Sequence, residues 1–173
     1  SVSLSNNGNI VAIGAYAHDG NGSDAGRVRI YENNNGSWVQ LGQNIDGEAT
    51  NDQSSGGTGL SLNGDGTIVA IGALYNDGNG NNSGHTRIFE YDGILWQQMG
   101  PDIDGEANGD LSGWSVAMSY DGNTVAIGAW ANDGNGAPND NRGHVRVYNY
   151  DGSTWVQLGQ DIDGEAANDY SGK

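Results

Sequence analysis

The sequence predicts an all-β protein built from three repeats of four short antiparallel strands. The first observation is that the segment Val-Ala-Ile-Gly-Ala occurs at positions 11–15, 69–73 and 125–129. The second is that each copy is followed by a tryptophan and then by Ile-Asp-Gly-Glu-Ala. The third is a composition of 31 glycines with abundant Asn and Asp between short apolar clusters, which is typical of strands joined by tight turns. Helical periodicity is absent.

The repeats divide the chain into residues 1–58, 59–114 and 115–173. Repetition at a fixed period indicates a repeat architecture, in which each unit buries its apolar surface against its neighbours. The tryptophans recur at one position of the unit, as Trp38, Trp96 and Trp155. We therefore expect these side chains to pack between units.

Each predicted strand has its own signal, which is clearest in the third repeat. Alternating residues such as Val116 and Met118 mark the first strand, and the following Asp-Gly favours a hairpin turn because it tolerates positive φ. The second strand is a continuous apolar run, which suits a strand covered on both faces. The third alternates with period two and the fourth carries Trp155. The strands are expected at 115–119, 124–129, 144–150 and 154–159.

The other two repeats match this pattern. In the first repeat, strands are expected at 2–4, 10–15, 27–32 and 37–42, and in the second at 60–62, 68–73, 85–91 and 95–100. Four antiparallel strands per unit form the blade of a β-propeller, and such rings typically close with about four to eight blades. Three blades leave two faces bare, so we predict a head-to-tail homodimer that closes a six-bladed ring. A segment of a longer polypeptide or of a fibre is the alternative.

The charge of the chain excludes some partners. Six Lys and Arg against 22 Asp and Glu give a net charge of −16. Such a chain lacks the basic face that nucleic acid requires, and an anionic membrane surface is disfavoured for the same reason. No run approaches the roughly 20 apolar residues of a membrane span. Calcium is one natural counter-ion for the excess carboxylates, and solubility alone is the other explanation.

Several motifs of the third repeat resemble an FG-GAP repeat. They are Gly113-Trp-Ser-Val-Ala-Met-Ser, Asp121-Gly-Asn, Val125-Ala-Ile-Gly-Ala and Gly143-His-Val-Arg-Val-Tyr. FG-GAP repeats build the propeller of integrin α subunits and of many bacterial surface proteins. The resemblance implies a secreted or cell-surface module that acts as a scaffold or in adhesion and binding, and not an enzyme. The family's calcium loop between the first two strands is shortened here to a tight turn.

Calcium is therefore more plausible in the long loop after the second strand of each repeat. Oxygen ligands stand at alternate positions there, with Gly between them, as calcium loops require. The alternative is a turn-rich loop in which the side chains bond their own backbone. The candidate ligands are Asp19, Asn21, Ser23 and Asp24 in the first repeat, Asp77, Asn79 and Asn81 in the second, and Asp133 and Asn135 in the third.

The acidic connector between repeats is the alternative site. Three carboxylates within seven residues repel one another unless a cation or backbone N–H groups neutralise them. We interpret them first as structural groups between adjacent blades. These residues are Asp46, Glu48 and Asp52, then Asp104, Glu106 and Asp110, then Asp163, Glu165 and Asp169.

Ligand binding and catalysis complete the sequence-based predictions. Tyr16 and Trp130 hold equivalent positions at strand ends beside a loop, which suits sugar stacking in a multivalent lectin, and plugging of the blade rim is the alternative. A protein or a glycan is the expected ligand. Catalysis is not expected, because His85 and His144 are equivalent and are replaced by Arg27 in the first repeat. A single active site would break the repeat symmetry.

Overall fold

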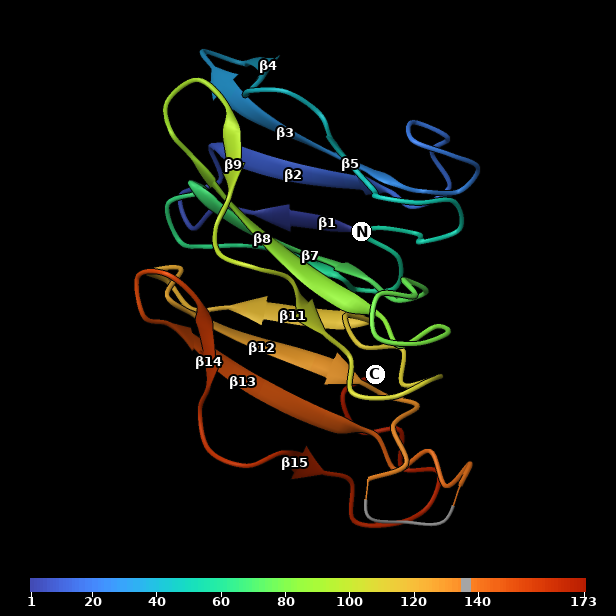
Figure 1. The fold of residues 1–173 in the computed structure, drawn as a ribbon. Coiled ribbons are helices and arrows are strands. Elements are labelled where there is room, and N and C mark those ends of the chain that lie inside the picture. The colour runs from blue at the N-terminus through green and yellow to red at the C-terminus, as the bar shows by residue number, and fades with distance from the viewer. Residues whose placement is uncertain (135–137) are drawn as a thin grey trace.

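The computed structural model describes residues 1–134 and 138–173, so that Asn135, one of the predicted calcium ligands, lies outside the described residues. Within them the chain forms three antiparallel sheets that follow one another in chain order (Figure 1). All the secondary-structure elements in the described ranges are strands, so these ranges contain no helix that could cross a membrane. The predicted all-β fold of three four-stranded blades is confirmed.

The blades share one strand order. In blade 1, β1 pairs with β2, β2 with β3, and the far side of β3 is shared by β4 and the short β5. Blades 2 and 3 repeat this arrangement. The strands of blade 1 are β1 (Val2–Leu4), β2 (Ile10–Ala15), β3 (Arg27–Asn34), β4 (Ser37–Gln40) and β5 (Ile45–Asp46). Those of blade 2 are β6 (Leu60–Leu62), β7 (Ile68–Ala73), β8 (His85–Tyr91), β9 (Trp96–Gln98) and β10 (Ile103–Asp104). Those of blade 3 are β11 (Ser115–Met118), β12 (Thr124–Ala129), β13 (His144–Tyr150), β14 (Trp155–Gln157) and β15 (Ile162–Asp163).

The strands β5, β10 and β15 were not predicted. Each is two residues of the acidic connector that pair antiparallel with the start of the third strand, as Ile103 pairs with Thr86 and Asp104 with His85. A two-residue strand is too short to show a period in the sequence. The pairing places the rest of the connector beside the next blade.

The core lies between blades and not within them. We call the face by which a blade contacts the preceding blade its leading face, and the opposite face its trailing face. The leading face of blade 2 packs on the trailing face of blade 1, and blade 3 packs on blade 2 in the same way. The first contact joins Leu60, Leu62, Val69, Ile71, Phe89 and Trp96 to Ala12, Val28, Ile30 and Ile45. The second joins Val125, Ile127, Tyr148 and Trp155 to Ile68, Ala70, Ile88 and Ile103.

The alternation of side chains explains why each strand serves two contacts. Val69 and Ile71 of β7 point to blade 1, whereas Ile68 and Ala70 between them point to blade 3. Every residue of β7 is buried, which accounts for its continuous apolar run. We call each contact between neighbouring blades a joint.

Candidate functional site

Each joint is held by a tryptophan that reaches the preceding blade. The indole Nε1 of Trp96 donates a hydrogen bond to the carbonyl oxygen of Leu41 at 2.8 Å, and Trp155 donates to that of Met99 at 2.7 Å. Gln43 adds two bonds to the first joint: its Nε2 donates to the carbonyl oxygen of Trp96, and its Oε1 accepts from the Trp96 N–H. Pro101 stands at the position of Gln43 in the second joint.

A buried carboxylate of each of the two inner connectors forms a second link between blades. Asp52 Oδ2 accepts a hydrogen bond from the backbone N–H of Ala49 and another from Asn76 Nδ2 of blade 2, at 3.1 Å. Asp110 and Asn132 repeat this link at 3.0 Å. Both carboxylates are buried, so their hydrogen bonds form away from water, where an unpaired charge would be costly.

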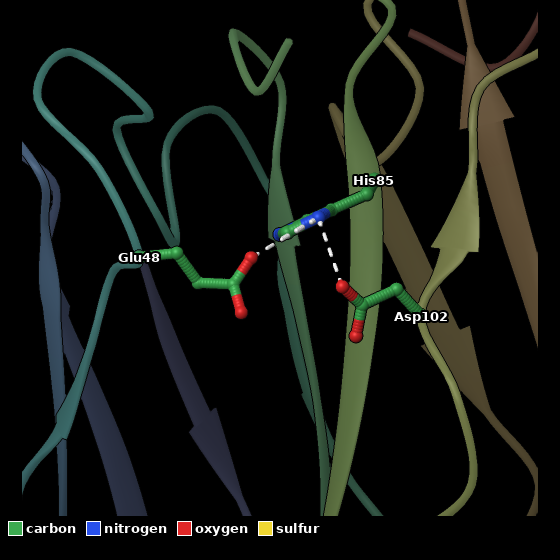
Figure 2. A group of neighbouring side chains, drawn as sticks. All are labelled: Glu48, His85 and Asp102. Atoms are coloured by element: carbon green, nitrogen blue, oxygen red, sulfur yellow. Dashed lines mark ion pairs between the residues drawn. The ribbon is translucent and has the colours of Figure 1, made fainter. Parts of the chain in front are cut away.

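The structure also gathers a histidine and two carboxylates at each joint. Figure 2 shows Glu48 from the connector and Asp102 from the loop before β10 on either side of the imidazole of His85, the first residue of β8. His85 Nδ1 lies 3.9 Å from Glu48 Oε2 and 3.7 Å from Asp102 Oδ2. In the second joint, His144 Nδ1 lies 3.8 Å from Glu106 and 3.9 Å from Asp161. We call these the histidine clusters.

Burial keeps the imidazoles of both clusters neutral. Desolvation of the buried ring, with the nearby charge of Arg87, lowers the pKa of His85 to about 4. The pKa of His144 is lowered for the same reasons, with Arg146 as the second cause. Burial raises the pKa of Glu48, and Arg87 partly opposes that effect. At neutral pH each cluster therefore places an uncharged imidazole beside two acidic side chains.

An arginine completes each joint beside the cluster. Arg87 Nη1 lies 3.4 Å from Glu48 Oε1, and its Nη2 donates a 2.8 Å hydrogen bond to the carbonyl oxygen of Asp46. The guanidinium also lies over the ring of Phe89, with 5.4 Å to the centroid. Arg146 makes the same three contacts in the second joint. Glu48 thus uses one oxygen for the arginine and turns the other toward the histidine.

Sequence reasoning missed the histidine clusters, because their members come from three separate segments of two blades. It treated the exchange of His85 for Arg27 as a sign that the histidine is not catalytic. In blade 1, however, Asn44 stands where blades 2 and 3 have Asp102 and Asp161. The histidine and this aspartate are present together in blades 2 and 3 and absent together in blade 1. This paired exchange is the sequence signal that could have revealed the clusters.

In blade 1 the guanidinium of Arg27 supplies a positive charge at the position that a histidine occupies in blades 2 and 3. Arg27 forms a two-pronged ion pair with Asp46 of the adjacent β5, in which Nε contacts Oδ1 and Nη2 donates to Oδ2 at 3.0 Å. The hydrogen bond that the Arg27 side chain donates to the Asp46 carboxylate is the main reason that the pKa of Arg27 is raised. The arginine therefore fixes its carboxylate partner within one blade, whereas the histidines face carboxylates of two blades.

The leading face of blade 1 presents the residues of a joint without a partner. Trp38 is 50% exposed, against 3% for Trp96 and 7% for Trp155. Val11, Ile13, Tyr31 and Trp38 line an apolar hollow of about 250 Å³. A second hollow of about 430 Å³ lies over Tyr16 and His18, where the connector of a preceding blade lies in the inner joints.

The trailing face of blade 3 is open as well. Ile162 is 58% exposed, although its equivalents Ile45 and Ile103 are buried. A Cβ on Gly42 would lie 2.8 Å from the Trp96 ring, whereas a Cβ on the equivalent Gly159 would meet nothing within 4 Å. The two open faces therefore hold, at equivalent positions, the residues that form the two inner joints.

The side chains of the predicted calcium loops are engaged in the structure. Asp19 accepts from the N–H of Asp24 at 2.9 Å, and Asp77 accepts from that of Asn82 at 2.7 Å. Asp133 accepts from the N–H groups of Asn139 and Asn141. Two further amides fasten the loop to the connector: Asn21 donates to the carbonyl of Gly47 and Asn79 to that of Gly105. Ser23 and Asn81 lie in the same loops. Calcium binding here stays a prediction.

The nine connector carboxylates divide into three groups. Asp46 pairs with Arg27, and its equivalents Asp104 and Asp163 hold the same place in β10 and β15. Glu48 and Glu106 join the histidine clusters, and Asp52 and Asp110 bind the asparagines of the next blade. Glu165 and Asp169, their equivalents after blade 3, are exposed.

The two predicted sugar-binding aromatics differ in their surroundings. Trp130 packs edge-on against Trp114 and Tyr170, with ring centroids 5.6 and 5.5 Å apart. The ammonium of Lys173 lies 5.0 Å from the Trp130 ring centroid. Tyr16 is exposed on the leading face of blade 1, and its equivalent Leu74 in blade 2 is buried.

Residues 103–148 match the family model of the FG-GAP repeat, which confirms the predicted resemblance for that segment. No curated protein matches the chain. Among solved structures, the chain is similar to a protein assigned as TolB from Agrobacterium tumefaciens, at 17% sequence identity and a TM-score of 0.48. That similarity covers 95% of this chain and 50% of the other, so the chain spans about half the length of that protein.

Proposed function

We propose that the chain is a non-catalytic propeller module that assembles with a second copy of itself, head to tail, into a six-bladed ring. The observation that carries the proposal is the complementarity of the open faces. The leading face of blade 1 and the trailing face of blade 3 hold the residues that form the two inner joints, at equivalent positions. Two copies pair both faces at once, which closes the assembly by symmetry.

The apolar layer of the inner joints supports this pairing. In the first joint, Leu60 and Leu62 of blade 2 are buried against blade 1, whereas the equivalent Val2 and Leu4 of blade 1 are exposed. The exposed Ile162 of one copy would lie against this face, as Ile45 lies against blade 2. Burying apolar surface contributes roughly 25 cal/mol per Å², so uncovered joint faces favour association.

Hydrogen-bond groups are in place as well. Trp38 would donate to the carbonyl oxygen of Leu158 of the partner, as Trp96 donates to that of Leu41. Gln160 stands at the position of Gln43 and would pair with the backbone of the partner's Trp38. In the second inner joint Pro101 replaces the glutamine, so these two hydrogen bonds are missing there. In this respect the contact between copies would resemble the first inner joint.

Charge also favours head-to-tail pairing. Arg29 already lies over Tyr31, 5.7 Å from the ring centroid, in the posture of Arg87 and Arg146 in the inner joints. Glu165 of a second copy would meet Arg29, as Glu48 meets Arg87. Asp169 would meet His18, which replaces the asparagine that Asp52 and Asp110 bind. Opposite charges on the two faces steer association toward this register.

The same account explains Tyr16. Its equivalent Leu74 is covered by the connector that enters from the preceding blade, since the Tyr75 N–H donates to the carbonyl oxygen of Asp52 there. The hollow over Tyr16 is where residues 169–173 of a second copy would lie. Exposure of Tyr16 therefore supports assembly more directly than it supports sugar binding.

Light scattering of the chain across protein concentrations tests the proposal. A ring gives a mass of twice 18.0 kDa that stays constant as concentration rises. Leu4→Asp on one face and Ile162→Asp on the other should each give a folded monomer. Each of the two contacts in the ring pairs the leading face of one copy with the trailing face of the other, so either substitution disrupts both contacts. Ile94→Asp is the matched control: Ile94 is 76% exposed in the turn between β8 and β9, away from the joints, and its replacement should leave the mass unchanged.

Three results would contradict the proposal. One is a monomer of the unaltered chain at all concentrations. Another is a ladder of masses that grows with concentration, which indicates open filaments. The third is a dimer that survives both Leu4→Asp and Ile162→Asp, because another surface would then hold it.

We further propose that the module acts outside the cell as a scaffold or binding domain, with calcium bound in its acidic loops. FG-GAP repeats are typical of extracellular proteins, and residues 103–148 match that repeat. The net charge of −16 supports cation binding in general. Isothermal titration with calcium, compared with Asp19→Ala and Asp77→Ala variants, tests the loop sites. Unaltered calcium binding in the double variant would remove them from consideration.

A further inference from the structure

The histidine clusters have a donor set that suits a metal ion. One donor atom each of Glu48, His85 and Asp102 lies within 4.8 Å of the other two, and Glu106, His144 and Asp161 repeat the arrangement. Donors around a tetrahedral Zn²⁺ lie roughly 3.3–3.6 Å apart, given metal–ligand distances near 2.0–2.2 Å. The nitrogen-to-oxygen separations of 3.7 to 3.9 Å are slightly longer, the two carboxyl oxygens lie within 4.8 Å of each other, and both carboxyl groups are on partly exposed side chains.

Both imidazoles are buried, and the Nδ1 atom of each faces the two carboxyl groups of its cluster. His85 and His144 are each 1% exposed. In the described ranges, Nε2 of neither ring has a hydrogen-bond partner. At 3.7 to 3.9 Å the Nδ1 atoms lie too far from the carboxyl oxygens for direct hydrogen bonds, and a metal ion between them would engage all three groups.

The adjacent arginines leave one donor oxygen of each glutamate for an ion. Arg87 contacts Oε1 of Glu48, and Oε2 is the oxygen nearest His85. Arg146 and Glu106 divide their contacts in the same way. The cluster thus sets two acidic side chains, Glu48 and Asp102, against one arginine, which leaves a place for a second cation.

We propose that each histidine cluster binds one divalent transition-metal ion of the zinc class, so that each chain holds two ions, one in each inner joint. The histidine supplies one nitrogen and the two carboxylates supply one oxygen each. Water completes the coordination, and the second cluster has room for it, because Glu106 and Asp161 line a hollow of about 270 Å³. One nitrogen and two oxygens suit Zn²⁺ better than Ca²⁺, which takes oxygen ligands.

The role of such an ion would be to tie blades together. Glu48 belongs to blade 1, whereas His85 and Asp102 belong to blade 2, so the ion would bridge the two. Blade 1 has Arg27 and Asn44 at the corresponding positions, and the guanidinium already supplies a positive charge there. The sites lie inside one chain, so the proposal stands whether or not two copies associate.

Titration of the metal-free chain with ZnCl₂ in a calorimeter tests the proposal, with Co²⁺ absorption as a second readout. We expect two ions per chain and a higher midpoint of thermal unfolding. His85→Gln should remove one ion, and the double variant with His144→Gln should remove both. Outer-shell changes already alter metal affinity about 10–100-fold, so Asp102→Asn should weaken one site by about tenfold or more.

His18→Gln is the matched control, because His18 is the third histidine of the chain and belongs to neither cluster. It should leave both ions in place. Circular dichroism of the metal-free variants separates loss of ligand from loss of fold. The proposal is overturned if no saturable binding occurs, if a folded double variant still binds two ions, or if only His18→Gln abolishes binding. NMR of the histidine ring nitrogens should show the Zn²⁺-dependent shift at Nδ1, and a shift at Nε2 alone would contradict the geometry.

Discussion

The indole nitrogen of Trp96 donates its hydrogen to the carbonyl oxygen of Leu41, 2.8 Å away in the preceding blade. This bond ties the outer strand of one blade to the chain leaving the other. It accompanies a buried ring, so both packing and hydrogen bonding at this point stabilise the joint. Trp38 has the same place in blade 1 and is half-exposed.

Trp96→Phe should therefore destabilise the chain, whereas Trp38→Phe should not. Loss of the N–H removes the hydrogen bond to the partly buried Leu41 carbonyl, which costs about 0.5–1.5 kcal/mol, and the smaller ring adds a packing loss. Urea unfolding followed by fluorescence measures the difference, at a concentration where the chain is monomeric. Equal loss in both variants would show that the contact with the preceding blade contributes nothing.

Gly42→Ala and Gly159→Ala form a second matched pair. Both glycines have positive φ, 68° and 75°, so alanine meets the same backbone strain at either position. Only at Gly42 would the new Cβ also press on the Trp96 ring. We expect Gly42→Ala to lower the free energy of unfolding by about 1–3 kcal/mol more than Gly159→Ala. In an assembled ring, Gly159→Ala should instead weaken the pairing of copies, which light scattering would detect.

Aspartates in the turns before β9 and β14 should make the stability of the fold sensitive to acid. Asp92 accepts from the backbone N–H groups of Leu95 and Ile94, and Asp151 accepts from those of Thr154 and Ser153. These bonds lower the pKa of both carboxyls below the ordinary value of about 3.9. The folded state then binds fewer protons than the unfolded one, so the stabilisation is full above about pH 5 and is lost as the pH falls through the folded pKa.

NMR titration of the two carboxyl groups should show both pKa values below that of a free aspartate. Asp151→Asn keeps an acceptor oxygen but has no charge to titrate, so it should reduce the loss of stability between pH 5 and pH 3 (about the window set by the ordinary value). An unchanged pH profile in that variant would assign the acid sensitivity to other groups.

A third metal site can be introduced to test both proposals together. Arg27→His with Asn44→Asp gives blade 1 the histidine and aspartate of blades 2 and 3, but the matching glutamate is Glu165 of a second copy. If copies pair head to tail, zinc binding should rise from two to three ions per chain, and Glu165→Gln should return it to two. A third ion in a monomer, or one insensitive to Glu165→Gln, would contradict the predicted pairing.

The sequence predicted the blades well because each strand carries its own signal. The alternation in β13 and the apolar run in β12 depend on neighbours within a few residues. The histidine clusters have no such local signal, since Glu48, His85 and Asp102 are brought together by the pairing of β10 with β8 and by the joint. Comparison among the repeats holds the missing information: blade 1 changes both the histidine and the aspartate, and a change at two distant positions indicates contact.

Packing likewise decided what repetition alone left open. The recurrence of Trp38, Trp96 and Trp155 predicted one role for all three, but Trp38 is exposed because no blade precedes it in the structure. The same holds for Tyr16 and Leu74. Equivalent residues share a conformation, whereas their burial depends on which neighbour is present.

Blade 2 differs from the others in having both faces covered, and every residue of β7 is buried, while β2 has exposed positions. Opening blade 2 would break two joints at once, and opening either end blade would break one. The free energy of local unfolding should therefore be highest in blade 2 and lower in the two end blades of the single chain. Backbone amides in β7 and β8 would exchange with solvent most slowly, and unfolding would proceed inward from the ends. Pairing with a second copy would remove this gradient, because every blade would then be an interior one.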